Sequence, residues 1–220
     1  MKMLAACAHS IRAIGLFCLV FLSLSGCSVL QHAPRPVVYD FGPGATTQAA
    51  TNRMAHMPAL ALSNVQAATA LDSTAVQYRL AYSDAQQLRP YTQARWSMPP
   101  AELLRHRLRE QLAQRRAVLN PADGVIADSS LQNLRVELDE FSQLFESESQ
   151  SAGLVRLRAT LSQSGRGGDK LIAQRSFVVQ RASTSGDAPG GVRALTAAVD
   201  AVILELDQWL QQVQPAVAGN

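Results

Sequence analysis

The chain has 220 residues, of which 47% are hydrophobic, 20 are Lys or Arg and 17 are Asp or Glu. Two of the cations, Lys2 and Arg12, and none of the anions lie in the first 26 residues, which leaves 18 cations against 17 anions in the rest of the chain. This nearly neutral balance gives no reason to expect a nucleic-acid partner, and the length is enough to bury the core of one ordinary domain.

The first 26 residues have the pattern of a secretory signal peptide. Positive charges precede an apolar stretch at residues 13–22, and small residues follow it. The apolar stretch is too short for a comfortable transmembrane helix, which needs about 20 residues. We therefore expect residues 1–26 to be removed on export.

The residues Leu24-Ser25-Gly26-Cys27 match the bacterial lipobox. In a lipobox the Cys thiol takes a diacylglycerol, a peptidase cuts before the Cys, and the new amine is usually acylated. We predict lipidation of Cys27; the alternatives are an ordinary signal peptide with a chance Cys, or a true membrane helix. Two or more acyl chains give stable anchoring. The protein would then be held in the bacterial cell envelope, facing the periplasm.

The sequence around Cys27 supports three further expectations. Cys7 and Cys18 leave with the signal, so the mature domain would have no disulfide and would depend on its hydrophobic core. Under the enterobacterial sorting rule an Asp after the lipidated Cys retains the protein in the inner membrane, so Ser28 favours the outer membrane. Residues 27–36, with two prolines, are predicted to form a short tether.

The domain is predicted to begin with short strands. We expect strands at residues 37–41, 58–65 and 75–82, the last because alternate side chains of a strand share one face. Residues 42–58 are rich in Gly, Ala, Thr, Asn and Pro and are interpreted as a loop. No element is assigned to residues 88–98.

The segment with Tyr91 and Trp96 leads into a predicted helix. We expect both aromatic side chains to pack in the core, with a binding platform as the alternative. Two prolines at the entry and a Glu in the first turn favour a helix start, and the helix should end before Asn120-Pro121 because proline restricts the residue before it. One stripe at helical spacing consists of Ala101, Leu104, Leu108 and Leu112.

Three further strands are predicted after this helix. Residues 134–139 and 154–161 alternate cleanly between apolar and polar side chains. Residues 171–180 follow a Gly-rich turn, and Arg175 interrupts their apolar register, which predicts a bulge or an edge position.

Charges on the first two of these strands indicate how they pair. Glu137 and Asp139 are expected to lie opposite Arg156 and Arg158 on the outward face. Such cross-strand pairs favour antiparallel neighbours by roughly 0.2–1 kcal/mol each.

A long helix is predicted to open at Asp187. Its apolar residues recur at alternating steps of three and four, which favours burial against the domain's own sheet, with a coiled-coil seam as the alternative. This stripe consists of Val192, Leu195, Val199, Val202, Leu206, Trp209 and Val213.

The order of strands, helix, strands and helix predicts an α+β fold. We expect a two-layer sandwich, with a largely antiparallel sheet and both helices packed on one of its faces. The domain is predicted to span residues 37–213, and residues 214–220 to form a tail.

The sequence offers no motif for catalysis or metal binding. Outside the signal the histidines are His32, His56 and His106, and no two of them have metal-ligand spacing. No serine or carboxylate set can be placed as a catalytic group. We therefore predict no metal, no cofactor and no enzymatic activity.

Three arginines of the first predicted helix form a candidate surface for a partner. At 100° per residue, Arg105, Arg109 and Arg116 fall on one side of that helix. This side could face anionic lipid headgroups or an acidic partner. The alternative is an ordinary solvated helix face.

The pattern Tyr-x-x-x-Arg-Trp-x-x-Pro-Pro occurs at residues 91–100, just before the first predicted helix. It stands in order with the lipobox at Cys27, residues 39–42, the strand at 134–141 and the closing helix with Trp209-Leu210. In these features the chain resembles the ABC-type transport auxiliary lipoprotein family, which includes the paraquat-inducible protein C lipoproteins. The Ala/Thr-rich stretch at 45–57 departs from the family pattern.

The resemblance implies an accessory role in transport. Members accompany systems built from an ABC ATPase, a permease and a membrane-anchored MCE-domain protein, which are thought to move lipids or other apolar molecules. The lipoprotein is implied to dock on the MCE component without catalysis, and a ring of identical copies would be a natural arrangement. The alternatives are a structural envelope lipoprotein that binds cell wall or an assembly machine, and a lipid-modifying hydrolase.

Overall fold

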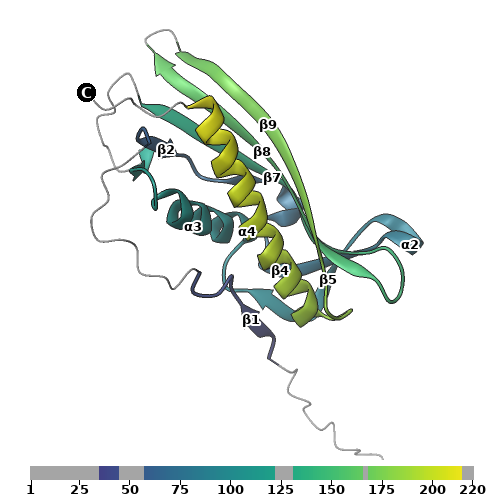
Figure 1. The fold of residues 1–220 in the computed structure, drawn as a ribbon. Coiled ribbons are helices and arrows are strands. Elements are labelled where there is room, and N and C mark those ends of the chain that lie inside the picture. Colours follow the sequence, from purple (N-terminus) through teal and green to yellow (C-terminus); the bar gives the residue numbers. More distant parts are fainter. Residues whose placement is uncertain (1–34, 45–56, 122–130, 166–167, 215–220) are drawn as a thin grey trace, which may run out of the picture. The chain divides into compact units, whose positions relative to one another are not determined.

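The computed structural model describes residues 35–44, 57–121, 131–165 and 168–214. The largest feature of this part of the chain is an antiparallel meander of three long strands (Figure 1). These strands are β7 (Gln132–Phe145), β8 (Ser151–Gly165) and β9 (Gly168–Ala182). All three predicted strands of this region are confirmed, and each is longer than its alternating pattern indicated.

Strand β9 lies at an edge of the sheet, because it pairs only with β8. The edge position predicted for this strand is therefore confirmed. The register between the two strands shifts at Ile172, since Leu161 lies opposite Ala173 whereas Ser162 lies opposite Leu171. The bulge predicted at Arg175 is therefore found three residues earlier in the strand. The Arg175 guanidinium lies 4.9 Å from the centre of the Phe177 ring.

The opposite edge of β7 is shared by three short strands in succession. Strand β2 (Leu60–Leu62) pairs with its beginning, β3 (Gln66–Ala67) with its middle and β4 (Ala75–Leu80) with its end, all in parallel. The short η1 helix (Thr69–Leu71) lies between β3 and β4, and β6 (Val118–Leu119) pairs in parallel with β2. The sheet is therefore mixed, although its longest pairings are antiparallel.

Residues 85–96, to which the sequence assigned no element, form a strand. A single turn of helix, α2 (Ala81–Asp84), turns the chain from β4 into β5 (Ala85–Trp96), which runs antiparallel to β4. The register between β4 and β5 shifts between Ala75 and Gln77. Strand β1 (Val37–Tyr39) pairs in parallel with the end of β5, so β1 forms the sheet edge opposite β9.

Two longer helices cover one face of the sheet. Helix α3 (Pro100–Leu112) contacts helix α4 (Ala188–Val213), and α4 packs on β7, β8 and β9 (Figure 1). The predicted α+β class and the placement of the helices are confirmed. Helix α3 ends at Leu112, earlier than expected. At the start of α4, the Asp187 carboxylate accepts a hydrogen bond from the Gly190 backbone N–H at 2.8 Å, as an N-cap residue does.

The core lies between these helices and the sheet. The α4 stripe is buried, apart from the half-buried Val213 at its end, so packing against the domain's own sheet is confirmed. Trp96 is 2% exposed, and its ring lies 5.5 Å from both the Phe41 and the Phe141 rings, so core packing rather than a platform is confirmed for this residue.

A bulge in β7 changes which of its residues face the helices. Leu138 lies opposite Leu157, but Phe141 lies opposite Val155, so one extra residue is inserted between these pairs. Before the bulge the even-numbered positions face the helices, and after it the odd-numbered positions do. Gln143 therefore points into the core.

Because of this bulge, the charged residues of β7 and β8 pair differently from the prediction. Arg158 approaches both Glu137 and Asp139 at 3.8 Å. Arg156 lies opposite Glu140, which the register shift brings to the outward face, and not opposite Asp139 as expected. Glu140 in turn forms an ion pair with Arg79 of β4 at 3.0 Å.

Candidate functional site

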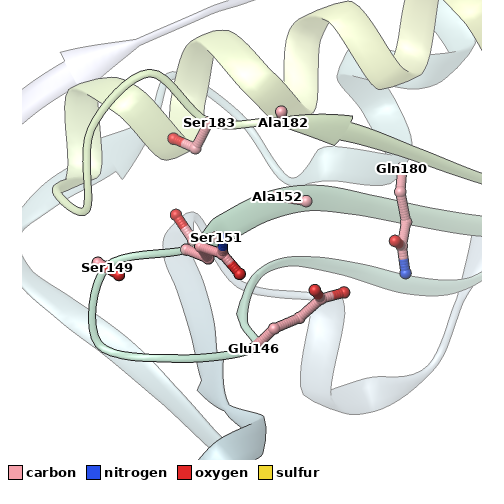
Figure 2. A pocket seen from close by; sticks show the side chains of 8 residues that line it. Glu146, Ser149, Ser151, Ala152, Gln180, Ala182 and Ser183 are labelled. Carbon is pink, nitrogen blue, oxygen red and sulfur yellow. The ribbon is translucent and has the colours of Figure 1, made fainter.

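Two serine-rich segments far apart in the sequence meet at one end of the sheet and enclose a hollow of about 390 Å³. One is the turn between β7 and β8, and the other follows β9 and leads into α4. Figure 2 shows the lining side chains, with Ser183 on one side of the strand that carries Ala152 and Glu146 on the other. The lining residues are Glu146, Ser149, Gln150, Ser151, Ala152, Gln180, Ala182 and Ser183.

The buried Gln143 amide joins these two segments, in addition to a backbone hydrogen bond from the Ser183 N–H to the Ser151 carbonyl at 2.8 Å. Gln143 is fully buried, and its Nε2 donates to Ser151 Oγ at 2.9 Å and more weakly to Ser183 Oγ at 3.4 Å and the Ser185 carbonyl at 3.3 Å. Its Oε1 accepts a hydrogen bond from the Tyr91 hydroxyl at 2.7 Å. The back wall of the hollow is therefore fixed by hydrogen bonds from the core.

Tyr91 completes this network from strand β5. Burial is the largest cause that raises the pKa of Tyr91 above its ordinary value, followed by the nearby Tyr78 and Asp187, so the hydroxyl keeps its proton to a higher pH than an ordinary tyrosine does. Its ring also packs on the Tyr78 ring, with centroids 4.6 Å apart. Tyr91 was expected in the core as an apolar side chain, and its role as a hydrogen-bond donor was not predicted.

Replacing Gln143 with leucine is expected to lower the free energy of unfolding by about 1–3 kcal/mol, because the Tyr91 and Ser151 hydroxyls would lose their buried partner. Urea unfolding of the unlipidated mature chain measures this change. The matched control is Gln174→Leu, which removes an exposed amide that donates to Thr160 at 2.8 Å. We expect the control to change stability by less than about 0.5 kcal/mol; equal effects of the two substitutions would contradict the role given to Gln143.

The hollow offers hydrogen bonds but few charges. Glu146 is the only charged residue of its lining, and the other polar groups are serine hydroxyls and glutamine amides. Such a lining suits a neutral polar or a positively charged group and disfavours an anion. Within the part of the chain that the structure describes, no three His, Cys, Asp or Glu side chains are placed to hold a metal ion.

The three arginines predicted as one surface do not form one. Arg105 lies 3.8 Å from Glu102 and its side chain is 19% exposed, and Arg109 is half-buried. Arg116 is only 3% exposed and faces α4, where its Nη2 lies 3.7 Å from Asp207 Oδ1. The expectation of an outward Arg116 was wrong because the helix ends at Leu112, and the turn after it directs this side chain inward.

The sequence analysis also did not predict that a second arginine, Arg107, connects α3 with α4. Arg107 Nε donates to Asp200 Oδ1 at 2.8 Å, and its Nη2 donates to the Phe41 carbonyl at 3.3 Å. The hydrogen bond to Asp200 raises the pKa of Arg107 above its ordinary value. Asp200 and Asp207 lie seven residues apart on α4, a spacing that places both on one face of the helix. This spacing in the sequence could have indicated that α4 presents two carboxylates to arginines of the first helix region.

Cys27, the predicted lipidation site, lies outside the described residues, as do His32 and His56. His106 lies on the exposed side of α3 and borders a hollow of about 340 Å³, which is also lined by residues 40–42 just after β1. Within the described segments, no helix combines the length and the apolar character needed to span a membrane.

Comparison with known proteins gives matches at two levels. Among solved structures, a protein from Xanthomonas campestris is similar with a TM-score of 0.61 and 23% sequence identity, over 72% of this chain and 86% of that chain. An uncharacterized protein matches with a TM-score of 0.58 and 14% identity, over 80% and 99%. A hypothetical protein from Chlamydia trachomatis matches with a TM-score of 0.51 and 8% identity, over 71% and 98%. No curated protein matches the chain.

The structural matches define the class of fold, an α+β domain with a mixed sheet covered by helices, and at this identity they show the fold alone. The sequence goes further, because a model of the ABC-type transport auxiliary lipoprotein component family matches residues 39–206. Since this match covers most of the chain, the protein belongs to that family. It is an accessory lipoprotein of a transport system with an ABC transporter, its place is the cell envelope, and the family is not a known enzyme family.

Proposed function

We propose that the protein is anchored to a membrane through lipid on Cys27 and docks on the MCE-domain component of its transporter without catalysing a reaction. The family match over residues 39–206 carries this proposal, because it names an auxiliary lipoprotein of ABC-type transport. The lipobox ending at Cys27 supports the anchor. A membrane-held accessory has to recognise a partner, and it needs no reactive group to do so.

The polar hollow is the part of the domain that we propose for contact with the partner. Its two segments are fixed by the buried Gln143, so little order would have to be gained when a partner binds. Its hydroxyls and amides would form the hydrogen bonds that are usual in protein interfaces. Three lining residues, Glu146, Ser149 and Gln180, can be exchanged without touching the core, since all three are exposed.

Affinity capture from crosslinked cell envelopes tests the docking. The tagged lipoprotein is expected to recover an MCE-domain protein, and Ser149→Arg together with Gln180→Arg is expected to reduce this recovery several-fold while the fold is kept. Repeated capture without an MCE protein would contradict the proposal. Sedimentation with purified cell wall, unchanged when the transporter is deleted, would instead favour a structural envelope lipoprotein.

Export of the chain from residue 28 onward, behind a signal peptide that is cleaved without lipidation, is expected to release the protein from the membrane, because no acyl chain can then be attached. Fractionation of cells should move the protein from the membrane pellet to the soluble periplasmic fraction, and the mass of the wild-type N-terminus should show residues 1–26 removed and acyl groups on Cys27. We propose the outer membrane as its location on the basis of Ser28, and density separation of the two membranes tests this. An unmodified Cys27 would refute the anchor.

A further inference from the structure

We infer that the edge strand β1 is a membrane-contact surface, at which Val37 and Val38 touch the lipid bilayer to which the protein is anchored. This inference rests on the proposed lipidation of Cys27 and adds to it the side of the domain that faces the membrane. Val37 is 54% exposed and Val38 62% exposed. The remaining large hydrophobic side chains with comparable exposure among the described residues are Tyr82, Leu171, Val178 and Leu204.

The two valines differ from these others in being consecutive. Single exposed apolar side chains are normal on a protein surface and need no explanation. An adjacent pair on an edge strand is different, because neighbouring side chains of a strand point to opposite faces and both remain uncovered here. β1 pairs with β5 on one side only, so its outer edge carries no strand of the described domain.

The strand is fixed to the body of the domain and does not simply continue the tether. The Tyr39 carbonyl accepts a hydrogen bond from the Ser97 backbone N–H at 2.7 Å. Two residues later Phe41 is buried, 5.5 Å from the Trp96 ring, and its carbonyl accepts from Arg107. The exposed valines are thus presented by a rigid surface, and contact through them would orient the whole domain.

The length of chain before β1 requires the membrane to be near. Nine residues, 28–36, separate Cys27 from Val37. Even fully extended, such a segment spans no more than about 35 Å. Val37 therefore stays close to the bilayer whatever the shape of the tether, and even weak apolar contacts can form at such a high local concentration.

The residues beside the valines fit a lipid surface. Arg35 is exposed, and an Arg next to an apolar side chain can place its guanidinium among the headgroup phosphates while the apolar side chain enters the boundary of the acyl chains. Pro36, also exposed, has no N–H to leave unpaired at the apolar boundary.

Depth-sensitive fluorescence tests the inference on the full lipidated protein in vesicles of phosphatidylethanolamine and phosphatidylglycerol. Cys7 and Cys18 leave with the signal and Cys27 is acylated, so an introduced cysteine is the only free thiol. A fluorophore on Val38→Cys is expected to be quenched by spin-labelled acyl chains several-fold more than one on Val178→Cys. Val178 is the matched control, because it is 59% exposed and lies on β9 at the opposite edge of the sheet.

A second pair of variants separates the valines from the tether. With the fluorophore on Arg35→Cys, the change of Val37 and Val38 to serine is expected to lower quenching several-fold. Unchanged quenching in the serine variant would show that the tether alone keeps this region near lipid, and equal quenching at positions 38 and 178 would show no preferred face; either result overturns the inference. Flotation with the vesicles is measured in parallel, so a protein that does not float refutes the lipid anchor itself, and the contact inferred from it.

Discussion

Replacing Asp207 with alanine is expected to lower the free energy of unfolding by about 3 kcal/mol, because the substitution leaves the Arg116 guanidinium buried without its counter-charge. The Arg116 side chain is fully buried and the Asp207 side chain is 14% exposed. Burial lowers the pKa of Arg116, which expresses the cost of keeping this charge away from water, and Asp207 partly offsets it. Urea unfolding of the unlipidated mature chain measures the change.

A double-mutant cycle shows whether the buried charge is the cause. Arg116→Met removes the charge with a side chain of similar length, so Asp207→Ala should cost little in the Arg116→Met background. The control is Arg115→Ala, since Arg115 is 57% exposed and lies 3.9 Å from the same carboxylate. We expect this control to cost less than about 0.5 kcal/mol. If Asp207→Ala were equally costly with and without Arg116, the explanation would fail.

A methyl group at Gly153 is expected to destabilise the domain by about 3 kcal/mol, because it would displace helix α4. A Cβ at this position of β8 would lie 2.5 Å from both the Ala194 carbonyl carbon and the Leu195 nitrogen. These are backbone atoms of a helix with a buried apolar face, so they cannot move without disturbing the core. Thermal unfolding of Gly153→Ala should show a lower Tm than the wild-type chain.

Gly165 provides the control on the same strand. A Cβ there would lie 3.4 Å from the Gly168 carbonyl oxygen, which is an ordinary contact. Gly165→Ala is therefore expected to be neutral or slightly stabilising, since it removes freedom from the unfolded chain. Equal losses of Tm at the two positions would mean that the close approach of α4 at Gly153 is not the cause.

The parts of the fold that sequence reasoning predicted are those with a regular apolar period. Strands β7 and β8 show clean alternation, and α4 has a stripe at helical spacing, so each element faces the core as predicted. Strand β5 was missed because it contains Pro90 and no sustained alternation. The parallel pairing of the short strands β2 and β3 with β7 was also missed, because each spans three residues or fewer and its partner lies far along the chain.

The candidate site was harder to predict because it depends on local irregularities. The β7 bulge reverses the inward face, and nothing in the alternation at residues 134–139 indicates where it occurs. Without the bulge, the alternation of β7 predicts that Gln143 lies on the outward face of the sheet. In the same way, the inward direction of Arg116 follows from the three turn residues between α3 and Arg116, which the helical pattern does not indicate.

The bulge also explains a glycine at the start of α4. It turns the Gln143 side chain toward the helices, where its amide lies directly beneath Gly191. A Cβ at Gly191 would collide with the Gln143 Oε1, so any side chain there would overlap the amide. The first turn of α4 can therefore approach the sheet this closely only because residue 191 has no side chain.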